Sequence, residues 1–189
     1  MRRIIWIVLS MIAITALVGC GSSGPKEPGS VIEKELDGAP DWVLKGKGAD
    51  GKEIYGVGAV GGTRNVALAR STAQGRGRTE IARSLEVSVQ SMLKDYQSTT
   101  SGGEYFGRAA NDEQHIEDVA KQITDISLSG TRQEDHWISD TGTLYVLMAL
   151  DVEDFKEAVN GMTQLNEHVR EAVKERADEA FEELDRALR

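Results

Sequence analysis

The sequence predicts an α+β fold, namely a two-layer domain with a mostly antiparallel sheet of about four strands, packed helices and a long C-terminal helix. Runs of β-branched and aromatic residues alternate with stretches in which apolar residues recur at helical spacing. Turn residues separate the last two strand-like runs, which indicates a hairpin. The final stretch, residues 153–189, is highly charged around a narrow apolar stripe, which is typical of a long surface helix.

The chain begins with a predicted lipoprotein signal peptide, residues 1–19. Arg2 and Arg3 precede an apolar run over residues 4–18, and Cys20, the only cysteine, follows Leu-Val-Gly. The alternative is a transmembrane helix, but the run is shorter than the about 20 apolar residues that a bilayer span needs. We therefore expect cleavage before Cys20 and acylation of its sulfur, since a charged start, a short apolar middle and a cysteine are typical of exported lipoproteins.

Residues 20–39 are predicted to form a lipidated flexible tether, because Gly, Ser, Pro and charged residues leave little apolar surface to bury. Gly21, rather than an aspartate, follows Cys20, which favours the outer membrane and leaves open the periplasmic face or the cell surface. A formal net charge of −9 argues against a nucleic-acid partner, which selects clustered Lys and Arg. The membrane contact expected is the lipid on Cys20.

The body, residues 40–152, starts with a predicted strand over residues 53–60 that is rich in β-formers. A helix follows, with Thr63 or Asn65 as its cap and small residues on its buried stripe. From Leu85 the apolar residues alternate with polar ones up to Lys94, which predicts a half-buried second strand.

A second helix is predicted over residues 109–125, and its buried stripe contains Ile116, Val119, Ala120 and Ile123. Residues 126–137 and 143–151 are predicted as the hairpin strands. Apolar residues occupy both faces of the last strand, so we expect it to be central and covered on both sides.

Several of these segments together resemble the Lpp-twenty lipoprotein family over about residues 40–152. The resemblance is carried by Pro-Asp-Trp-Val at 40–43, Tyr-Gly-Val-Gly at 55–58, Leu-Glu-Val-Ser-Val at 85–89, Ser-Gly-Thr at 129–131 and Leu-Tyr-Val-Leu at 144–147. It implies an outer-membrane or surface-exposed bacterial lipoprotein without catalytic residues, and some members belong to the flagellar apparatus.

Residues 56–61 spell G-x-G-x-x-G between a strand and a helix, as a dinucleotide site requires. That site also needs an acidic residue at the end of a second parallel strand, about 20 residues on. Glu80 falls inside the predicted helix and Glu86 opens the next strand, so we interpret the glycines as a tight turn and expect no cofactor.

Other candidate residues give weak signals. His115, His136 and His168 lack metal-ligand spacing, so no metal site is predicted, although the fold could still bring them together. Trp42 either packs at the junction of tether and domain or caps the sheet edge or lines a ligand groove. Arg76 and Arg78 either lie on a solvated helix face or contact phosphate or an acidic partner.

The closing stretch, residues 153–189, is the predicted interaction element. A helix of about 36 residues would be about 54 Å long at 1.5 Å per residue, longer than a domain of this size is wide. We therefore expect part of it to project and to mediate contact with a protein partner or self-association; the alternative is that its first half packs on the sheet and its second half frays in solvent. The candidate interface residues are Phe155, Val159, Met162, Val169, Val173, Leu184 and Leu188.

These observations predict a lipid-anchored envelope protein that acts as a structural, assembly or interaction module and is not an enzyme. No catalytic residues are predicted. The alternatives are a lipoprotein that binds a small molecule or peptidoglycan fragment, which would show a concave apolar pocket, and an enzyme whose site is assembled by the fold.

Overall fold

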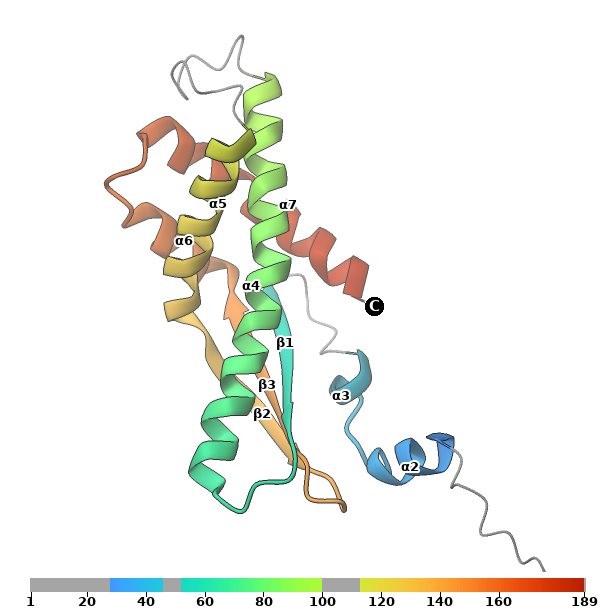
Figure 1. Ribbon diagram of the computed structural model, residues 1–189. Coiled ribbons are helices and arrows are strands. Elements are labelled where there is room, and N and C mark those ends of the chain that lie inside the picture. The colour runs from blue at the N-terminus through green and yellow to red at the C-terminus, as the bar shows by residue number, and fades with distance from the viewer. Residues whose placement is uncertain (1–27, 46–51, 100–112, 189) are drawn as a thin grey trace, which may run out of the picture. The chain divides into compact units, whose positions relative to one another are not determined.

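The computed structural model describes residues 28–45, 52–99 and 113–188, and Cys20 therefore lies outside the described residues. The chain divides into two compact units, residues 1–33 and 34–189. The second unit holds the sheet and the helices that cover it, and Figure 1 shows their arrangement.

Three antiparallel strands form the sheet in the described residues. They are β1 (Glu53–Val60), β2 (Arg132–Ile138) and β3 (Leu144–Asp151), in the spatial order β1-β3-β2. The predicted hairpin and the central position of the last strand are thus confirmed, but the first hairpin strand begins at residue 132 and not at 126, because residues 126–130 are helical. The α+β class is confirmed as well, but the sheet has one strand fewer than the sequence indicated.

The segment that was predicted to form the additional strand is helical. Helix α4 (Val66–Thr99) runs without a break through residues 85–94, where alternation predicted a strand, and that prediction is wrong. Leu85 and Val89 are fully buried one turn apart, while Val87, expected on their face, is 66% exposed. Apolar residues four apart satisfy both a helical stripe and an alternating pattern, and burial against neighbouring helices selected the helix.

Helices cover the inner face of the sheet. Helix α4 lies along β1 and β3, and α5 (Glu113–Ser127) packs against α4, followed by the 3-10 turn η2 (Leu128–Gly130). The predicted stripe of α5 is confirmed, since all four of its residues are buried. The predicted cap of α4 is also confirmed, because Asn65 Oδ1 accepts a hydrogen bond of 3.1 Å from the Leu68 amide.

The closing stretch forms two helices, not one. Helix α6 (Val152–Asn160) and α7 (Glu167–Leu188) are separated by a short bend and pack against each other. The Arg170 guanidinium stabilises the bend by donating hydrogen bonds to the carbonyls of Met162 and Leu165, at 3.1 and 2.9 Å. The prediction of a single projecting helix is therefore wrong, because the bend returns α7 to pack on α4.

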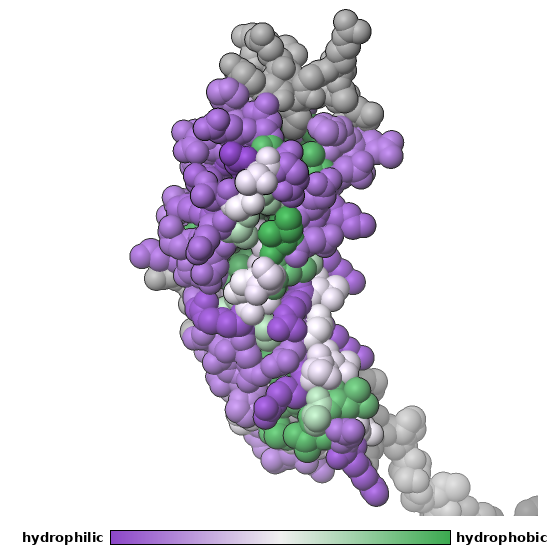
Figure 2. Space-filling view, turned by 90° about the vertical axis from the view of Figure 1, so that its left-hand side faces the viewer, coloured by the Kyte–Doolittle hydropathy of each residue, from purple (hydrophilic) through white to green (hydrophobic). Residues whose placement is uncertain are grey.

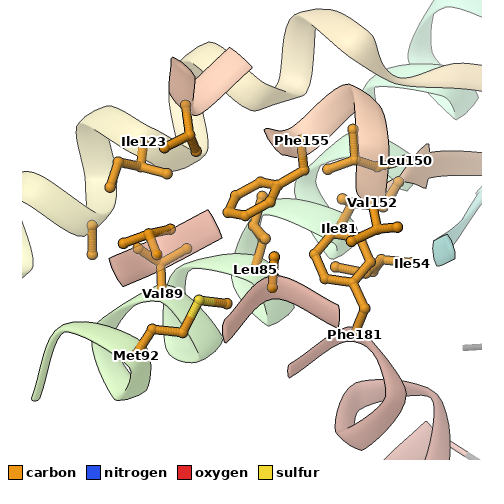
Figure 3. Close-up of a cluster of buried hydrophobic side chains, with 14 of the residues drawn as sticks. Ile54, Ile81, Leu85, Val89, Met92, Ile123, Leu150, Val152, Phe155 and Phe181 are labelled. Atoms are coloured by element: carbon orange, nitrogen blue, oxygen red, sulfur yellow. The ribbon is translucent and has the colours of Figure 1, made fainter. Parts of the chain in front are cut away.

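The main hydrophobic core lies between the inner sheet face and these four helices. Figure 3 shows Phe155 of α6 and Phe181 of α7 among core residues of α4, α5 and the sheet. Their ring centroids are 5.4 Å apart and both side chains are fully buried. The C-terminal helices thus contribute to the same core as the sheet.

A smaller core covers the outer face of the sheet. Trp42, in helix α3 (Trp42–Lys45), packs with Tyr55, Leu147 and Ala149. Helix α2 (Pro28–Glu35) also forms within the stretch predicted to be a flexible tether. Residues 34–45, here called the strap, are part of the second compact unit.

Candidate functional site

The glycine motif allows close packing between α4 and β1. A Cβ atom on Gly58 would lie only 2.6 Å from the Gly77 nitrogen and would collide with the Ala73 carbonyl oxygen of α4. A Cβ atom on Gly56 would similarly collide with the Gly77 carbonyl oxygen. The space that a pyrophosphate would need is therefore filled by helix backbone, which supports a structural role for these glycines.

Charged side chains of α4 cover the free edge of β1. The Arg76 guanidinium donates to the Ala59 carbonyl, and the Val57 amide donates to the Glu80 carboxylate. Backbone groups at a sheet edge otherwise remain open to pairing with another chain. Arg78 Nε donates to Thr131 Oγ1 at 3.0 Å, so both arginines of the glycine-rich segment bind within the chain.

The outer face of the sheet gathers aromatic side chains under the strap. Trp42 is 7% exposed, and its Nε1 donates a hydrogen bond of 2.9 Å to Asp135 Oδ2 on β2. Trp137 and Tyr145 pack beside it with ring centroids 5.3 Å apart. The interpretation of Trp42 as packing at the junction is confirmed, since the sheet binds both its ring and its N–H group.

Glu35 fastens the start of the strap to the hairpin. Its carboxylate accepts hydrogen bonds from Thr141 in the β2–β3 turn and from the Tyr145 hydroxyl, the latter at 3.1 Å. The bond from Thr141 is the main reason that the pKa of Glu35 lies below its usual value. Burial, together with the bond to Glu35, raises the pKa of Tyr145.

A polar network crosses the same face at the other end of β1. The Glu53 carboxylate pairs with Arg132 and accepts a hydrogen bond from the Tyr55 hydroxyl. Burial, followed by this bond, raises the pKa of Tyr55, and the bond to Glu53 raises the pKa of Arg132. These shifts stabilise the neutral Tyr55 hydroxyl and the charged Arg132 guanidinium, and the network ties β1 to β2.

The candidate interface on the closing stretch is mostly buried. Phe155, Val159, Met162, Val169 and Val173 are each 4% exposed or less and belong to the main core. They are therefore not a free docking surface in this structure. Leu184 is partly buried on α7, and the side chain of Leu188 lies outside the described set.

A groove of about 350 Å³ lies between α4 and α7, a site that the sequence patterns did not indicate. Its apolar lining includes Val87, Met92 and Leu184, and its acidic lining includes Asp95, Glu179 and Glu183. The exposed Val87 was the available signal, but reading residues 85–94 as a strand placed its side chain on the buried face.

The histidines do not converge. His115 lies on α5, His136 on β2 and His168 on α7, and the described residues contain no group of three His, Cys, Asp or Glu side chains suited to a metal ion. Within residues 28–45, 52–99 and 113–188, no helix has the length and apolar character needed to cross a membrane.

Comparison with known proteins identifies the family. The family model described as LPP20 lipoprotein matches residues 40–151, which is more than half of the chain's 189 residues. Searches of curated proteins and of solved structures each returned no match. The matched range runs from the strap to the last residue of β3, and the resemblance inferred from the sequence is confirmed: the chain belongs to the LPP20 lipoprotein family.

Proposed function

We propose that this protein is a lipid-anchored envelope lipoprotein, acylated on Cys20, which acts as a structural, assembly or interaction module at the outer membrane and not as an enzyme. Membership of a lipoprotein family carries the proposal. The sequence before Cys20 supports it, because an export signal ending at a single cysteine supplies the acceptor sulfur.

The anchor is tested in a bacterial host that acylates lipoproteins. We expect mass spectrometry to find the mature chain starting at an acylated Cys20 and fractionation to recover it with membranes. Cys20→Ser is the matched variant and should leave the membrane fraction, because it removes only the acceptor sulfur. A bare Cys20, or a leader retained on the mature chain, would contradict the proposal.

The proposal places the protein at the outer membrane and not at the inner membrane. Gly21 in place of an aspartate supports it, and separation of inner from outer membranes on a density gradient tests it. A flagellar role is supported by the family resemblance alone. Loss of motility on deletion of the gene, restored by the wild-type chain but not by Cys20→Ser, would support it, whereas normal motility would contradict it.

The groove between α4 and α7 is the surface that we propose for a protein partner. Val87 and Leu184 offer apolar contacts, and the charged lining consists of Asp95, Glu179, Glu183 and one cation, Arg176, so acidic groups predominate. A basic segment with apolar side chains fits this chemistry better than a second copy of a chain with a net charge of −9.

A photo-crosslinking residue at position 87, compared with one at the exposed Thr79, tests this contact in the native host. We expect a crosslink from position 87 to a peptide that carries Lys or Arg beside apolar residues. A crosslinked product that contains two copies of this chain would indicate self-association instead. Equal crosslinking from positions 87 and 79 would contradict specific binding in the groove.

A further inference from the structure

One end of the second compact unit carries an exposed apolar surface. Val66 and Leu68, in the first turn of α4, are 71% and 55% exposed, and Ile138, the last residue of β2, is 61% exposed. These three residues are here called the tip. Figure 2 shows hydrophobic side chains gathered at the lower end of the molecule, where Figure 1 places the start of α4 and the β2–β3 turn.

Two of the three tip residues share one surface. Val66 and Ile138 line the same small cavity, of about 160 Å³, whose wall also includes Leu144 of β3. Arg70 lines this cavity as well, and Arg64 is exposed two residues before Val66. An apolar surface next to arginines is suited to the boundary of a bilayer, where acyl chains lie beside anionic headgroups.

The length of the chain limits how far this end can lie from the anchor. Glu35 is bound to Thr141, in the turn that follows Ile138, so the strap enters the body at the tip. Residues 20–27 span at most about 29 Å when fully extended, and the helix Pro28–Glu35 adds about 12 Å. An acylated Cys20 therefore keeps the start of the strap within about 40 Å of the bilayer, and α4 extends for about 51 Å from the tip.

We propose that the tip is a second membrane contact, in which Val66, Leu68 and Ile138 enter the bilayer interface and Arg64 and Arg70 face headgroup phosphates. This inference rests on the proposed acylation of Cys20. The connection favours a lipid surface over a protein, because an acylated Cys20 keeps lipid within reach of this apolar end at all times. The body then stands on the membrane with the far end of α4 directed away from it.

The test uses full-length acylated chain in vesicles of phosphatidylethanolamine and phosphatidylglycerol that contain a nitroxide-labelled lipid. Single cysteines replace Val66 or Ile138 and carry an environment-sensitive fluorophore, with Val87→Cys as the control. Val87 is equally exposed but lies about 30 Å further along α4. We expect about twofold or stronger quenching at the two tip positions and none at Val87, since interfacial side chains lie about 5–10 Å into the bilayer.

Two further measurements separate the possible failures. Mass spectrometry of each sample reports acylation, so a bare Cys20 overturns the proposed function and this inference with it. An acylated chain whose tip is quenched no more than Val87 overturns this inference alone. Replacing Arg64 and Arg70 by Glu should weaken quenching at Ile138 in these anionic vesicles, and unchanged quenching would contradict the role given to the arginines.

Discussion

At the scale of single residues, the glycines of β1 set the distance between α4 and the sheet. Gly58→Ala should lower the free energy of unfolding by about 3 kcal/mol or more, because the added methyl group meets helix backbone that has no room to move. Urea denaturation followed by circular dichroism measures this change.

Gly75→Ala is the matched control for that substitution. Gly75 lies in α4, the helix that packs on Gly58, and a Cβ atom there meets nothing within 4 Å. The substitution should raise stability by about 0.5–1 kcal/mol through helix propensity. If both variants shifted stability in the same direction, the close packing of α4 on β1 would be wrong.

A buried hydroxyl gives a second prediction at this scale. Thr124 on α5 is 2% exposed, and its Oγ1 has no hydrogen-bond partner among the described residues. Thr124→Val should therefore raise the free energy of unfolding by about 1 kcal/mol, since a methyl group of similar size carries no desolvation cost. Thr124→Ser keeps the hydroxyl and loses the methyl group, so this control should be destabilised in the same denaturation experiment.

At the scale of elements, the strap should respond to acid. The pKa of Glu35 is lowered from 4.5, so its contribution to strap docking is complete above that value and is lost as pH falls through the lowered folded value. We expect the emission of Trp42 to shift to longer wavelength as the pH falls below 4.5, because strap release exposes the indole to water.

Glu35→Gln separates this step from general acid unfolding. The variant carries no titrating group at position 35, so its emission should change little over the range in which the wild-type strap is released. An identical acid profile in the two proteins would show that Glu35 does not fasten the strap.

The C-terminal helices give the second prediction at this scale. Phe181 of α7 is fully buried and contacts Phe155 of α6, so Phe181→Ala should cost about 3–5 kcal/mol of stability. Val87→Ala removes an exposed side chain and should change stability by less than about 0.5 kcal/mol. Equal, small effects in a thermal melt would indicate that α7 is not part of the core.

At the scale of the whole molecule, the sequence predicted elements better than their assembly. Local patterns predict the limits of β1, the existence of the hairpin and the buried stripe of α5, and the structure confirms these three features. Helix α6 ends before Gly161 and α7 begins after Asn166. These two residues were visible in the sequence, but the packing of α7 against α4, which accompanies the bend, was not.

Long-range contacts had no local signal at all. Glu35 and Thr141 are separated by more than 100 residues, so no pattern along the chain pairs them. To predict the groove between α4 and α7, one would likewise have to know that α4 is continuous and that a bend separates α7 from α6. Five of the seven candidate interface residues lie in the core, because a stripe indicates burial but does not say whether the covering surface belongs to the same chain.

The close seating of α4 on β1 also has a mechanical consequence. Glycine backbone meets helix backbone there, so the helix cannot slide along the strand without forcing side chains into one another. Further along, α5 and α7 hold its second half. Helix α4, about 51 Å long, should thus behave as a rigid element of the body. A partner bound near its C-terminal end should stay at a constant distance from the tip.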